Sequence, residues 1–541
     1  MTDSPPPNPP TTASGRGSDR SNPPDGAAVD AEQSGAMTHR EVLVVIGGLM
    51  VGLFLAALDQ TIVATALPTI VGELGGIEQY SWTVTAYLLT ATSSTPLYGK
   101  IGDLYGRKRV FQGAVVIFVL GSVVSAMASS MSVLILGRAV QGLGAGGLIA
   151  LTLAIVGDIV SPRERGRYQG LFGAVFGISS VLGPLLGGFF TESLSWRWVF
   201  WINVPLGLVA LLTIQRTLHL PRRRVEHAID YVGAGLIVSA VSALLLVTVW
   251  GGNEYEWTSP VIIGLAVAAV VLTATFVVWE LRAPEPLLPM RLFHNPVFST
   301  TNAVSFLFGI AFFGGIIYLP VYLQVVRGYG PTASGLHLLP LVLGIFVTST
   351  GSGQLITRTG RYKIFPVTGL VIIPLALLWL SGLTVDTPMW NVSLRIFVLG
   401  LGLGLVIQTL VVAVQNAVEP RDLGVATSSN TFFRSMGGAI GTAVFGSVLS
   451  ATLTSSIESQ FPGGPPPGFD PAAVSGTPEA IAALPAAVRE PLLVAFVDAI
   501  DRVFLVGVPV VLVALVLTLF LREIPLRETS GLQEAAREPM A

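Results

Sequence analysis

Apolar residues fill long stretches of this chain, and polar residues gather in short segments between them. An apolar run of about twenty residues is long enough to cross the hydrocarbon core of a bilayer as a helix. Fourteen such segments can be delimited, at roughly 42–68, 80–99, 110–129, 132–157, 168–190, 197–216, 229–250, 258–281, 296–323, 332–356, 364–384, 391–418, 423–450 and 496–521. The pattern predicts an all-α polytopic membrane protein with fourteen transmembrane helices, and an even number places both termini on one side.

Composition narrows the class further. Of the 541 residues, 52% are hydrophobic and only 11% are charged, with a mean hydropathy of +0.71, whereas soluble domains carry about 25% charged residues. The net charge of −2 and the few basic residues argue against a nucleic-acid partner. Because the chain has no cysteine, it has no disulfide, no thiolate metal site and no cysteine nucleophile.

The distribution of basic residues predicts the orientation. The loops that follow the even-numbered segments carry seventeen Lys and Arg, counting Arg216 at the edge of the sixth segment, whereas the opposite loops carry only Arg197, Arg327 and Arg489. Loops rich in Lys and Arg stay in the cytoplasm. We therefore expect a multi-pass protein of the plasma (inner) membrane with both termini cytoplasmic.

Three segments fall outside the apolar pattern. Residues 1–40 are rich in Pro, Ser, Gly and Asp and contain no signal-peptide core, which predicts a disordered cytoplasmic tail. The loop 451–495 is long and extracytoplasmic, and a tolerated insertion explains it better than a binding role. Residues 522–541 form a second cytoplasmic tail.

A sequence motif that occurs twice indicates that the fold is duplicated. GKIGDLYGRKRVF at 99–111 follows the second segment, and GQLITRTGRYKIF at 353–365 follows the tenth. Repeated six-helix halves are typical of transporters. The spacing between the copies exceeds six helices, so we expect an N-terminal half at 41–228, two inserted helices at 229–281 and a C-terminal half at 282–521.

The stretch GLGAGG at 142–147 matches the glycine pattern of a dinucleotide-binding loop. Such a loop must follow a strand and open a helix, but here the motif lies inside an apolar segment with no strand signal before it. Small residues let membrane helices approach each other closely. We therefore interpret the glycines as helix-packing residues and exclude a nucleotide site.

Asp59 and Arg138 are charged residues that lie inside apolar segments of the N-terminal half. Arg138 is in the fourth segment, and Asp59 is in the outer half of the first. A charge at the centre of a membrane helix costs at least about 2.5–3.5 kcal/mol, so these side chains should face the bundle interior or a wet cavity. Arg138 is either part of a buried structural pair or a proton-relay or gating residue, and Asp59 is either a helix-packing hydrogen-bond partner or a functional carboxylate. Burial raises the pKa of a carboxyl and a neighbouring arginine lowers it, so such a pair can be tuned to exchange protons near neutral pH.

Other polar residues in the apolar segments are candidates for lining a central cavity or for tying helices together, and the sequence alone does not separate these two roles. They are Gln141, Gln408, Gln415, Asn430 and Arg434. The loop GKIGDLYGRKR is a further candidate. Glycines at 99 and 106 permit a tight turn between packed helices, and Asp103 can cap the next helix or bond Arg107.

Together these motifs resemble the fourteen-helix drug:proton antiporter branch of the major facilitator superfamily. LDQTIVATALP (58–68) is similar to its first-helix motif, GKIGDLYGRKR (99–109) to the superfamily signature loop, and RAVQGLGAGG (138–147) to its fourth-helix motif. GISSVLGPLLGG (177–188) resembles the fifth-helix antiporter motif of this branch. Three more stretches also resemble segments typical of the branch: WRWVFWINVP (196–205), YLPVYLQVVRGYGP (318–331) and NTFFRSMGGAIGTA (430–443). One departure is Thr357, which stands in the second signature loop where the first has Asp103.

The resemblance implies roles for individual residues. Asp59 and Arg138 would serve proton coupling, and Gly99, Asp103, Gly106 and Arg107 would form a conformational-switch loop. In the antiporter motif, Gly183 and Pro184 would bend the helix, while Gly187 and Gly188 would allow tight packing.

The resemblance also implies a function. We expect the major facilitator fold and a proton-coupled exporter of hydrophobic organic compounds, with a weak indication of cationic ones, that works by alternating access as a monomer without a cofactor. An accessory partner is left open. The alternatives are a dedicated exporter of an endogenous lipid or metabolite and an uptake permease. No P-loop occurs, and the five histidines show no metal-ligand spacing, which argues against an ATP-driven pump, a metal site and an enzyme.

Overall fold

The computed structural model describes residues 39–75, 79–218, 230–252, 254–461, 481 and 484–528. Within these ranges the chain forms helices and contains no β-strand. A helix lies at each of the fourteen expected segments. The long helices are α2 (His39–Leu74), α3 (Tyr80–Tyr105), α4 (Arg107–Ala126), α5 (Met131–Ile159), α6 (Gln169–Ser193), α8 (Asn203–Thr217), α9 (Tyr231–Trp250), α10 (Pro260–Glu280), α11 (Pro296–Val321), α13 (Leu339–Thr359), α14 (Ile364–Leu380), α15 (Met389–Asn416), α16 (Leu423–Gln460) and α19 (Ala486–Leu519).

Short elements extend or connect these helices. The four-residue helix α7 (Trp198–Trp201) precedes α8, and α12 (Pro331–His337) precedes α13. The other short elements are η2 (Arg165–Tyr168), η3 (Met290–His294), the π-helical η4 (Tyr322–Val326) and η5 (Pro420–Asp422).

Twelve helices among the described residues are long and apolar enough to cross a membrane. The two expected segments outside this set are α14, which is apolar but has 17 residues, and α3, whose 26 residues include a run of Thr and Ser. The chain is therefore a multi-pass membrane protein, while the count of fourteen spanning helices stays a prediction.

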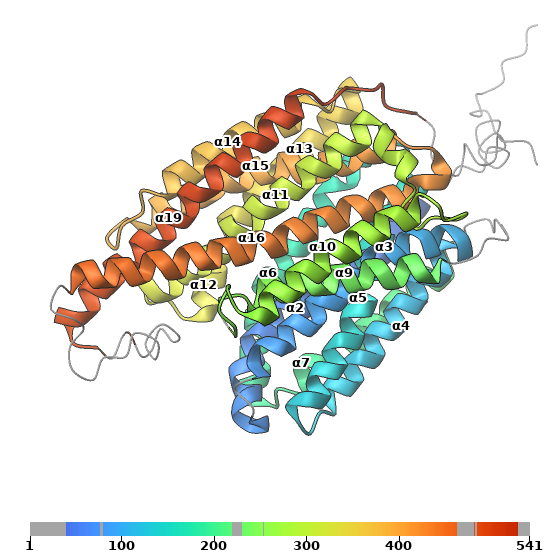
Figure 1. The fold of residues 1–541 in the computed structure, drawn as a ribbon. Helices are drawn as coiled ribbons and strands as arrows, with labels where there is room; N and C mark the ends of the chain where they lie inside the picture. The colour runs from blue at the N-terminus through green and yellow to red at the C-terminus, as the bar shows by residue number, and fades with distance from the viewer. Residues whose placement is uncertain are drawn as a thin grey trace, which may run out of the picture.

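The helices pack into two groups that follow the two expected halves. In Figure 1, α11, α13, α14, α15 and α19 lie together in the upper part, and α2, α4, α5 and α7 lie in the lower part. The apolar cores follow the same division, because one large cluster joins the C-terminal helices and two others join the N-terminal helices. The exact domain boundaries stay predictions.

The halves meet along two seams. In one seam α3 packs against α16, and in the other α6 packs against α13. The inserted helices α9 and α10 form a hairpin, and α9 packs on both α3 and α16 (Figure 1). Trp82 of α3 and Trp250 of α9 stack edge to face, with ring centroids 5.3 Å apart. The hairpin thus covers the α3–α16 seam from outside.

Helix ends depart from the expected boundaries around the loop 451–495. Helix α16 continues to Gln460, and α19 already begins at Ala486. Both extensions are held by packing, because Ile457, Leu492 and Ala495 belong to the C-terminal apolar cluster. The polar sequence after residue 450 hid this packing from hydropathy. Residues 462–480, like most of the two predicted tails, lie outside the described residues.

Candidate functional site

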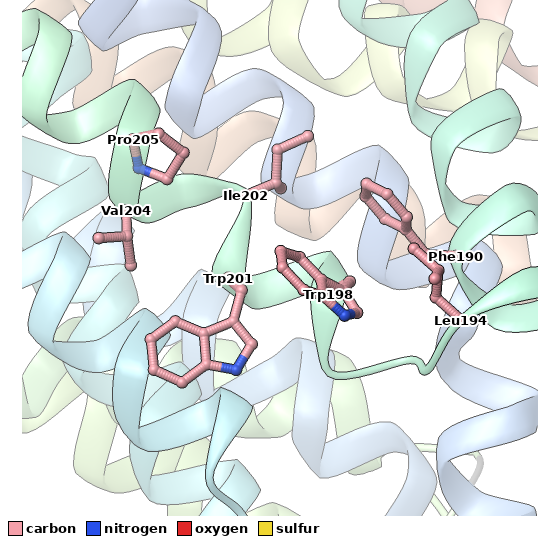
Figure 2. A pocket seen from close by; sticks show the side chains of 7 residues that line it. All are labelled: Phe190, Leu194, Trp198, Trp201, Ile202, Val204 and Pro205. Atoms are coloured by element: carbon pink, nitrogen blue, oxygen red, sulfur yellow. The ribbon is translucent and has the colours of Figure 1, made fainter.

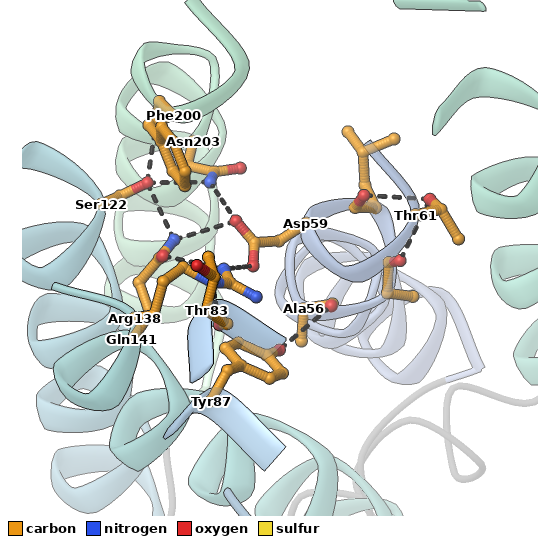
Figure 3. Close-up of polar contacts among 12 residues, drawn as sticks. Ala56, Asp59, Thr61, Thr83, Tyr87, Ser122, Arg138, Gln141, Phe200 and Asn203 are labelled. Atoms are coloured by element: carbon orange, nitrogen blue, oxygen red, sulfur yellow. Dashed lines mark hydrogen bonds and ion pairs between the residues drawn. The ribbon is translucent and has the colours of Figure 1, made fainter. Parts of the chain in front are cut away.

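Asp59 lies near the middle of α2 and is fully buried. Figure 3 shows its carboxylate pointing away from α2 toward side chains that come from α4, α5 and α8. The guanidinium Nη1 of Arg138 donates to Asp59 Oδ2 in an ion pair. Arg138 is also buried, with 2% of its side chain exposed. The two charges predicted from separate apolar segments are therefore brought together.

Arg138 has contacts on every side. Its Nη1 also donates to Gln141 Oε1 at 2.9 Å, and its Nε donates to the carbonyl oxygen of Thr83 at 3.4 Å. The guanidinium lies over the ring of Tyr87, 4.2 Å from the ring centre, a cation–π arrangement that stabilises a desolvated arginine. The hydroxyl of Tyr87 in turn donates to the carbonyl oxygen of Ala56 on α2.

Three neutral side chains complete the shell around the carboxylate. Gln141 Nε2 and Asn203 Nδ2 each donate to Asp59 Oδ1 at 2.9 Å. The same two amide nitrogens donate to Ser122 Oγ at 3.0 and 2.8 Å, and Ser122 donates to the carbonyl oxygen of Phe200. All three side chains are fully buried. We call Asp59, Ser122, Arg138, Gln141 and Asn203 the Asp59 network.

The Asp59 network decides between the two roles that were open for Gln141, and it adds two residues to the candidate site. Gln141 does not line a cavity, because its amide is fully buried and bonded to Asp59, Arg138 and Ser122. Ser122 and Asn203 were missed by the sequence reasoning. A single Asn or Ser inside an apolar segment is a weak signal, and their partners lie on other helices, 19 to 144 residues away in the sequence.

The network holds opposite charges out of contact with water. Such a pair is stable only while both partners are present, and removing one partner typically costs about 3–5 kcal/mol. Each Asp59 oxygen is bonded, whereas Asn203 Oδ1 has no hydrogen-bond partner among the described residues. A proton that neutralises the Asp59 carboxylate would leave Arg138 without a counter-ion, so this group of residues is able to couple protonation to a rearrangement.

The glycines of GLGAGG place α5 between two neighbours. A Cβ at Gly142 or Gly146 would collide with the backbone oxygen of Tyr87 or Ala91 on α3, and one at Gly144 would lie 2.6 Å from the carbonyl oxygen of Ala114 on α4. This confirms the helix-packing interpretation of the motif. The close approach fixes the position of Arg138, which precedes the motif by one turn.

The α6 motif packs against α2 in the region of Asp59. A Cβ at Gly183 would collide with Thr61, and one at Gly187 would lie 3.0 Å from the carbonyl oxygen of Ile62. Gly188 does not pack tightly, since nothing lies within 4 Å of its Cβ position, and the expectation for this glycine is wrong. Pro184 lies inside α6; its ring leaves the carbonyl oxygen of Ser180 without an intrahelical donor. The bend itself stays a prediction.

At one end of the bundle, polar contacts join the two halves. We call it the basic end, because it holds the basic loops predicted to be cytoplasmic. Asp103, in the last turn of α3 beyond the expected span, accepts a hydrogen bond from Arg107 Nη2 at 2.8 Å and one from the backbone N–H of Val425 on α16 at 3.2 Å. Arg107 also pairs with Asp158 of α5 at 2.8 Å. Burial raises the pKa of the Asp103 carboxyl to about 6, although Arg107 acts in the opposite direction.

Glycines allow the halves to touch here. Gly99 contacts α16, where a Cβ would lie 2.7 Å from the carbonyl oxygen of Gly424. Gly106 and its counterpart Gly360 in the second signature loop both adopt positive φ values, 89° and 71°, a conformation that other residues rarely adopt. The glycines at the two turns are therefore required by backbone geometry.

The second signature loop closes the other seam in a different way. Thr357 offers its backbone carbonyl oxygen to Arg163 Nε, at 3.1 Å, where the first loop uses the carboxylate of Asp103. Nearby, Gln415 accepts from Arg165 Nη1 at 2.6 Å and donates to the carbonyl oxygen of Leu153 at 3.1 Å. Gln415 therefore joins the two halves at the basic end; it is not placed to line a central cavity.

The C-terminal half has its own polar centre between α11 and α16. Asn430 Nδ2 donates to Ser305 Oγ at 2.7 Å and lies 3.5 Å from Asn302 Oδ1, and all three side chains are buried. Asn430 thus ties two helices together. Arg434, one turn further along α16, and Gln408 of α15 are only half-buried. Neither side chain has an ion pair or hydrogen bond with the described residues.

An apolar groove of about 550 Å³ lies where α6 approaches α7 and α8 (Figure 2). Its lining holds no charged side chain and consists of Phe190, Leu194, Trp198, Trp201, Ile202, Val204 and Pro205. Trp198 and Leu194 are exposed on the outer face of the helices. The groove is separate from the polar side chains of the Asp59 network, and no group of potential metal ligands occurs among the described residues.

Comparison with known proteins identifies the family. The family model described as Major Facilitator Superfamily matches residues 49–442, which include both polar centres and both seams. The chain belongs to the major facilitator superfamily. Members of this family are transporters, and the sequence expectation for the fold class is thereby confirmed.

Curated relatives cover most of the chain. An uncharacterised MFS-type transporter of Mycobacterium tuberculosis is 44% identical over 90% of this chain and 70% of its own length. The multidrug transporter protein MdtP of Bacillus subtilis is 35% identical over 94% of this chain and 98% of its own length. Multidrug resistance protein 3 of the same species is 34% identical over 91% and 97%. This transporter is therefore similar to multidrug efflux proteins along nearly its whole length.

Solved structures share the fold. The human organic anion transporter MFSD10 superimposes with a TM-score of 0.60 over 88% of this chain and 99% of its own, at 16% identity. The proton:xylose symporter XylE superimposes with a TM-score of 0.59 over 93% and 100%, at 13% identity. At these identities the likeness concerns architecture alone.

Proposed function

We propose that this protein is a proton-driven exporter of hydrophobic organic compounds across the plasma membrane. The observation that carries the proposal is the ion pair of Asp59 and Arg138, which is buried among the membrane helices. Ionisable residues at that depth are costly and typically serve proton or ion pathways. The multidrug transporters among the relatives, at 34–35% identity, support an organic substrate.

The coupling step follows from the charges of the network. With Asp59 ionised, the carboxylate and Arg138 neutralise each other. Protonation of Asp59 removes the attraction and leaves a buried arginine without a counter-ion, so the network rearranges to give Arg138 other acceptors or water. Thr61, two residues after Asp59, donates to the backbone oxygen of Ser179 on α6 at 2.9 Å. A shift of α2 would therefore reach the α6–α13 seam.

The contacts at the basic end give the other element of alternating access. Asp103 with Val425, Arg165 with Gln415 and Arg163 with Thr357 hold the halves together there. With that end facing the cytoplasm, the structure is closed to the cytoplasm. Export then requires these bonds to break so that substrate enters from the inside, and to reform when the transporter opens outward.

The proposal is tested with purified protein in liposomes that are acidic inside and alkaline outside. The probe is the neutral dye N-phenyl-1-naphthylamine, and the readouts are dye accumulation and the rise of internal pH. We expect dye to accumulate while protons leave. Asp59→Asn keeps the size of the side chain but cannot ionise, so it should abolish both signals. Asp498→Asn, an exposed carboxylate on α19, is the matched control and should leave both signals unchanged.

Each other outcome has a definite meaning. If Asp59→Asn transports as well as the wild type, Asp59 is structural and the coupling residue lies elsewhere. If the wild type moves neither this dye nor a panel of similar compounds, broad export is wrong, and a dedicated exporter of one endogenous lipid or metabolite takes its place. Accumulation driven in the opposite sense, with dye and protons moving together, would identify an uptake permease.

A further inference from the structure

The middle of the C-terminal half holds an arginine for which the described residues provide no counter-ion. Arg434 is the twelfth residue of α16, so it lies about 17 Å along the helix from Leu423 at about 1.5 Å per residue. This depth is near the middle of a hydrocarbon core about 30 Å thick. No carboxylate lies within ion-pair distance of its guanidinium among the described residues, whose ion pairs involve other arginines.

The face of α16 that carries Arg434 is turned into the C-terminal half. Asn430, four residues before it, bonds to Ser305 of α11, and a Cβ at Gly437, three residues after it, would collide with the backbone of Phe306 on α11. Residues three and four apart share one helix face. The hairpin of α9 and α10 packs on a different face, where Phe432 of α16 shares an apolar cluster with Ile237 and Val241 of α9. Arg434 therefore does not point into the lipid.

The side chain of Arg434 remains accessible. Asn430 and Gly437 are buried, whereas Arg434 between them is only half-buried. A second polar side chain without a partner lies at a similar depth: Gln408 of α15 is half-buried and lies about 12 Å along its helix from Asn416. A cation and an amide, both without protein partners, are thus available on two helices that each pack against α11.

We propose that Arg434 is the charge-recognition residue of the substrate path and that the preferred substrates are organic anions, with a carboxylate, sulfonate or phosphate on a hydrophobic body. This proposal rests on the proposed function and specifies its substrate class. Arginine presents a planar set of donors that matches such groups. In the low dielectric of the membrane, an anion would supply the counter-charge that the described part of the chain does not provide.

The charges of the Asp59 network agree with this assignment. Asp59 is the residue that gave the weak indication of cationic substrates, and it is fully buried. One of its oxygens pairs with Arg138, and the other accepts hydrogen bonds from Gln141 and Asn203. The Asp59–Arg138 pair is electrically neutral. A cationic substrate would therefore find no free carboxylate at this centre, and it would meet the positive charge of Arg434.

A matched pair of dyes tests the proposal. N-phenyl-1-naphthylamine and 8-anilino-1-naphthalenesulfonate share one aromatic skeleton and differ by a sulfonate. Their binding to the full-length protein in nanodiscs is measured by fluorescence without a proton gradient, after subtraction of the signal from empty nanodiscs. We expect the wild type to bind the sulfonate more tightly. Arg434→Gln should weaken its binding by about 10–100-fold, as expected for a charge-assisted hydrogen bond, and change binding of the neutral dye less than twofold.

Two variants control for indirect effects. Arg434→Lys keeps the charge and should retain most of the affinity for the sulfonate. Arg502→Gln removes one positive charge from the exposed surface of α19 and should change nothing. The proposal is overturned if the wild type does not prefer the sulfonate, or if Arg434→Gln weakens both dyes equally, which would indicate a structural role. Should the Gln variant not fold, the wild-type preference and the Lys variant still decide.

Binding and transport separate this proposal from the proposed function. If sulfonate binding depends on Arg434 but no dye is moved by a proton gradient, the anion site is supported and the proposed exporter function is wrong. Proton-driven movement of the neutral dye that is equal in the wild type and Arg434→Gln, without a preference for the sulfonate, would support the exporter and overturn the site.

Discussion

Each half of this transporter holds an arginine deep in a membrane helix, but the two arginines differ in their surroundings. In the N-terminal half, Arg138 is buried, paired with Asp59 and stacked on Tyr87. In the C-terminal half, Arg434 is half-buried and has no counter-ion among the described residues. The duplicated fold thus carries a neutral polar centre on one side and a positive one on the other. A satisfied pair suits a switch that opens when one partner is protonated, whereas a free charge suits recognition.

The strongest test of this difference is to remove each arginine in turn. Arg138→Leu leaves Asp59 buried without a cation, and we expect the free energy of unfolding to fall by about 3–5 kcal/mol. Arg434→Leu removes a charge that has no counter-ion in the described parts of the chain, so we expect stability to stay near the wild type or to rise. The free energies are measured by reversible unfolding of the purified proteins in mixed micelles with increasing SDS.

A double variant identifies the cause of the loss at Arg138. In Asp59→Asn with Arg138→Leu, neither charge remains, so most of the lost stability should return. If the double variant is as unstable as Arg138→Leu, the loss comes from packing of the arginine side chain. Equal losses for the two single arginine variants would remove the distinction between the centres.

The helices could be predicted from the sequence because the length and apolarity of a segment decide whether it forms a membrane helix. A bilayer demands about twenty apolar residues per helix, and a helix lies at each of the fourteen expected positions. The ends of α16 and α19 escaped prediction because the extensions of these helices are held by Ile457, Leu492 and Ala495. Tertiary packing of that kind leaves no mark on a hydropathy pattern.

The candidate site was predicted only in part, for a similar reason. Asp59 and Arg138 stand out in the sequence because a charge in an apolar run is costly. Their neutral partners Ser122 and Asn203 do not stand out, since one hydroxyl or amide is common in membrane helices. Gln141 was only a candidate for lining a cavity or tying helices together, although its spacing of three residues from Arg138 puts both on one helix face. Spacing within a helix is readable, but contacts between helices are not.

The next test gives the C-terminal centre the counter-ion that it lacks. Asn430 precedes Arg434 by four residues, so Asn430→Asp places a carboxylate where it can pair with the guanidinium. We expect this change to weaken binding of 8-anilino-1-naphthalenesulfonate by about tenfold, because the anion must displace an internal partner and approach a new negative charge. Binding is measured by fluorescence in nanodiscs.

The matched control for this test is Asn430→Ala. It also removes the hydrogen bond to Ser305 but adds no charge, so sulfonate binding should stay within about twofold of the wild type. If the Ala variant loses as much affinity as the Asp variant, the hydrogen bond between α11 and α16 matters for binding, and the charge of Arg434 does not.

The smallest expected effect compares one serine from each centre. Ser122 accepts from both Gln141 and Asn203, so Ser122→Ala leaves two buried amide donors each short of one partner. We expect a loss of about 1–3 kcal/mol in the free energy of unfolding. Ser305 accepts from Asn430 alone, and Asn430 retains Asn302 as a nearby acceptor, so Ser305→Ala should cost about 0.5–1.5 kcal/mol. The same SDS titration measures both. A larger loss for Ser122→Ala than for Ser305→Ala would support the view that the Asp59 network is the more tightly connected centre. A larger loss for Ser305→Ala would mean that the hydrogen bonds of the C-terminal centre contribute more to stability than those of the Asp59 network.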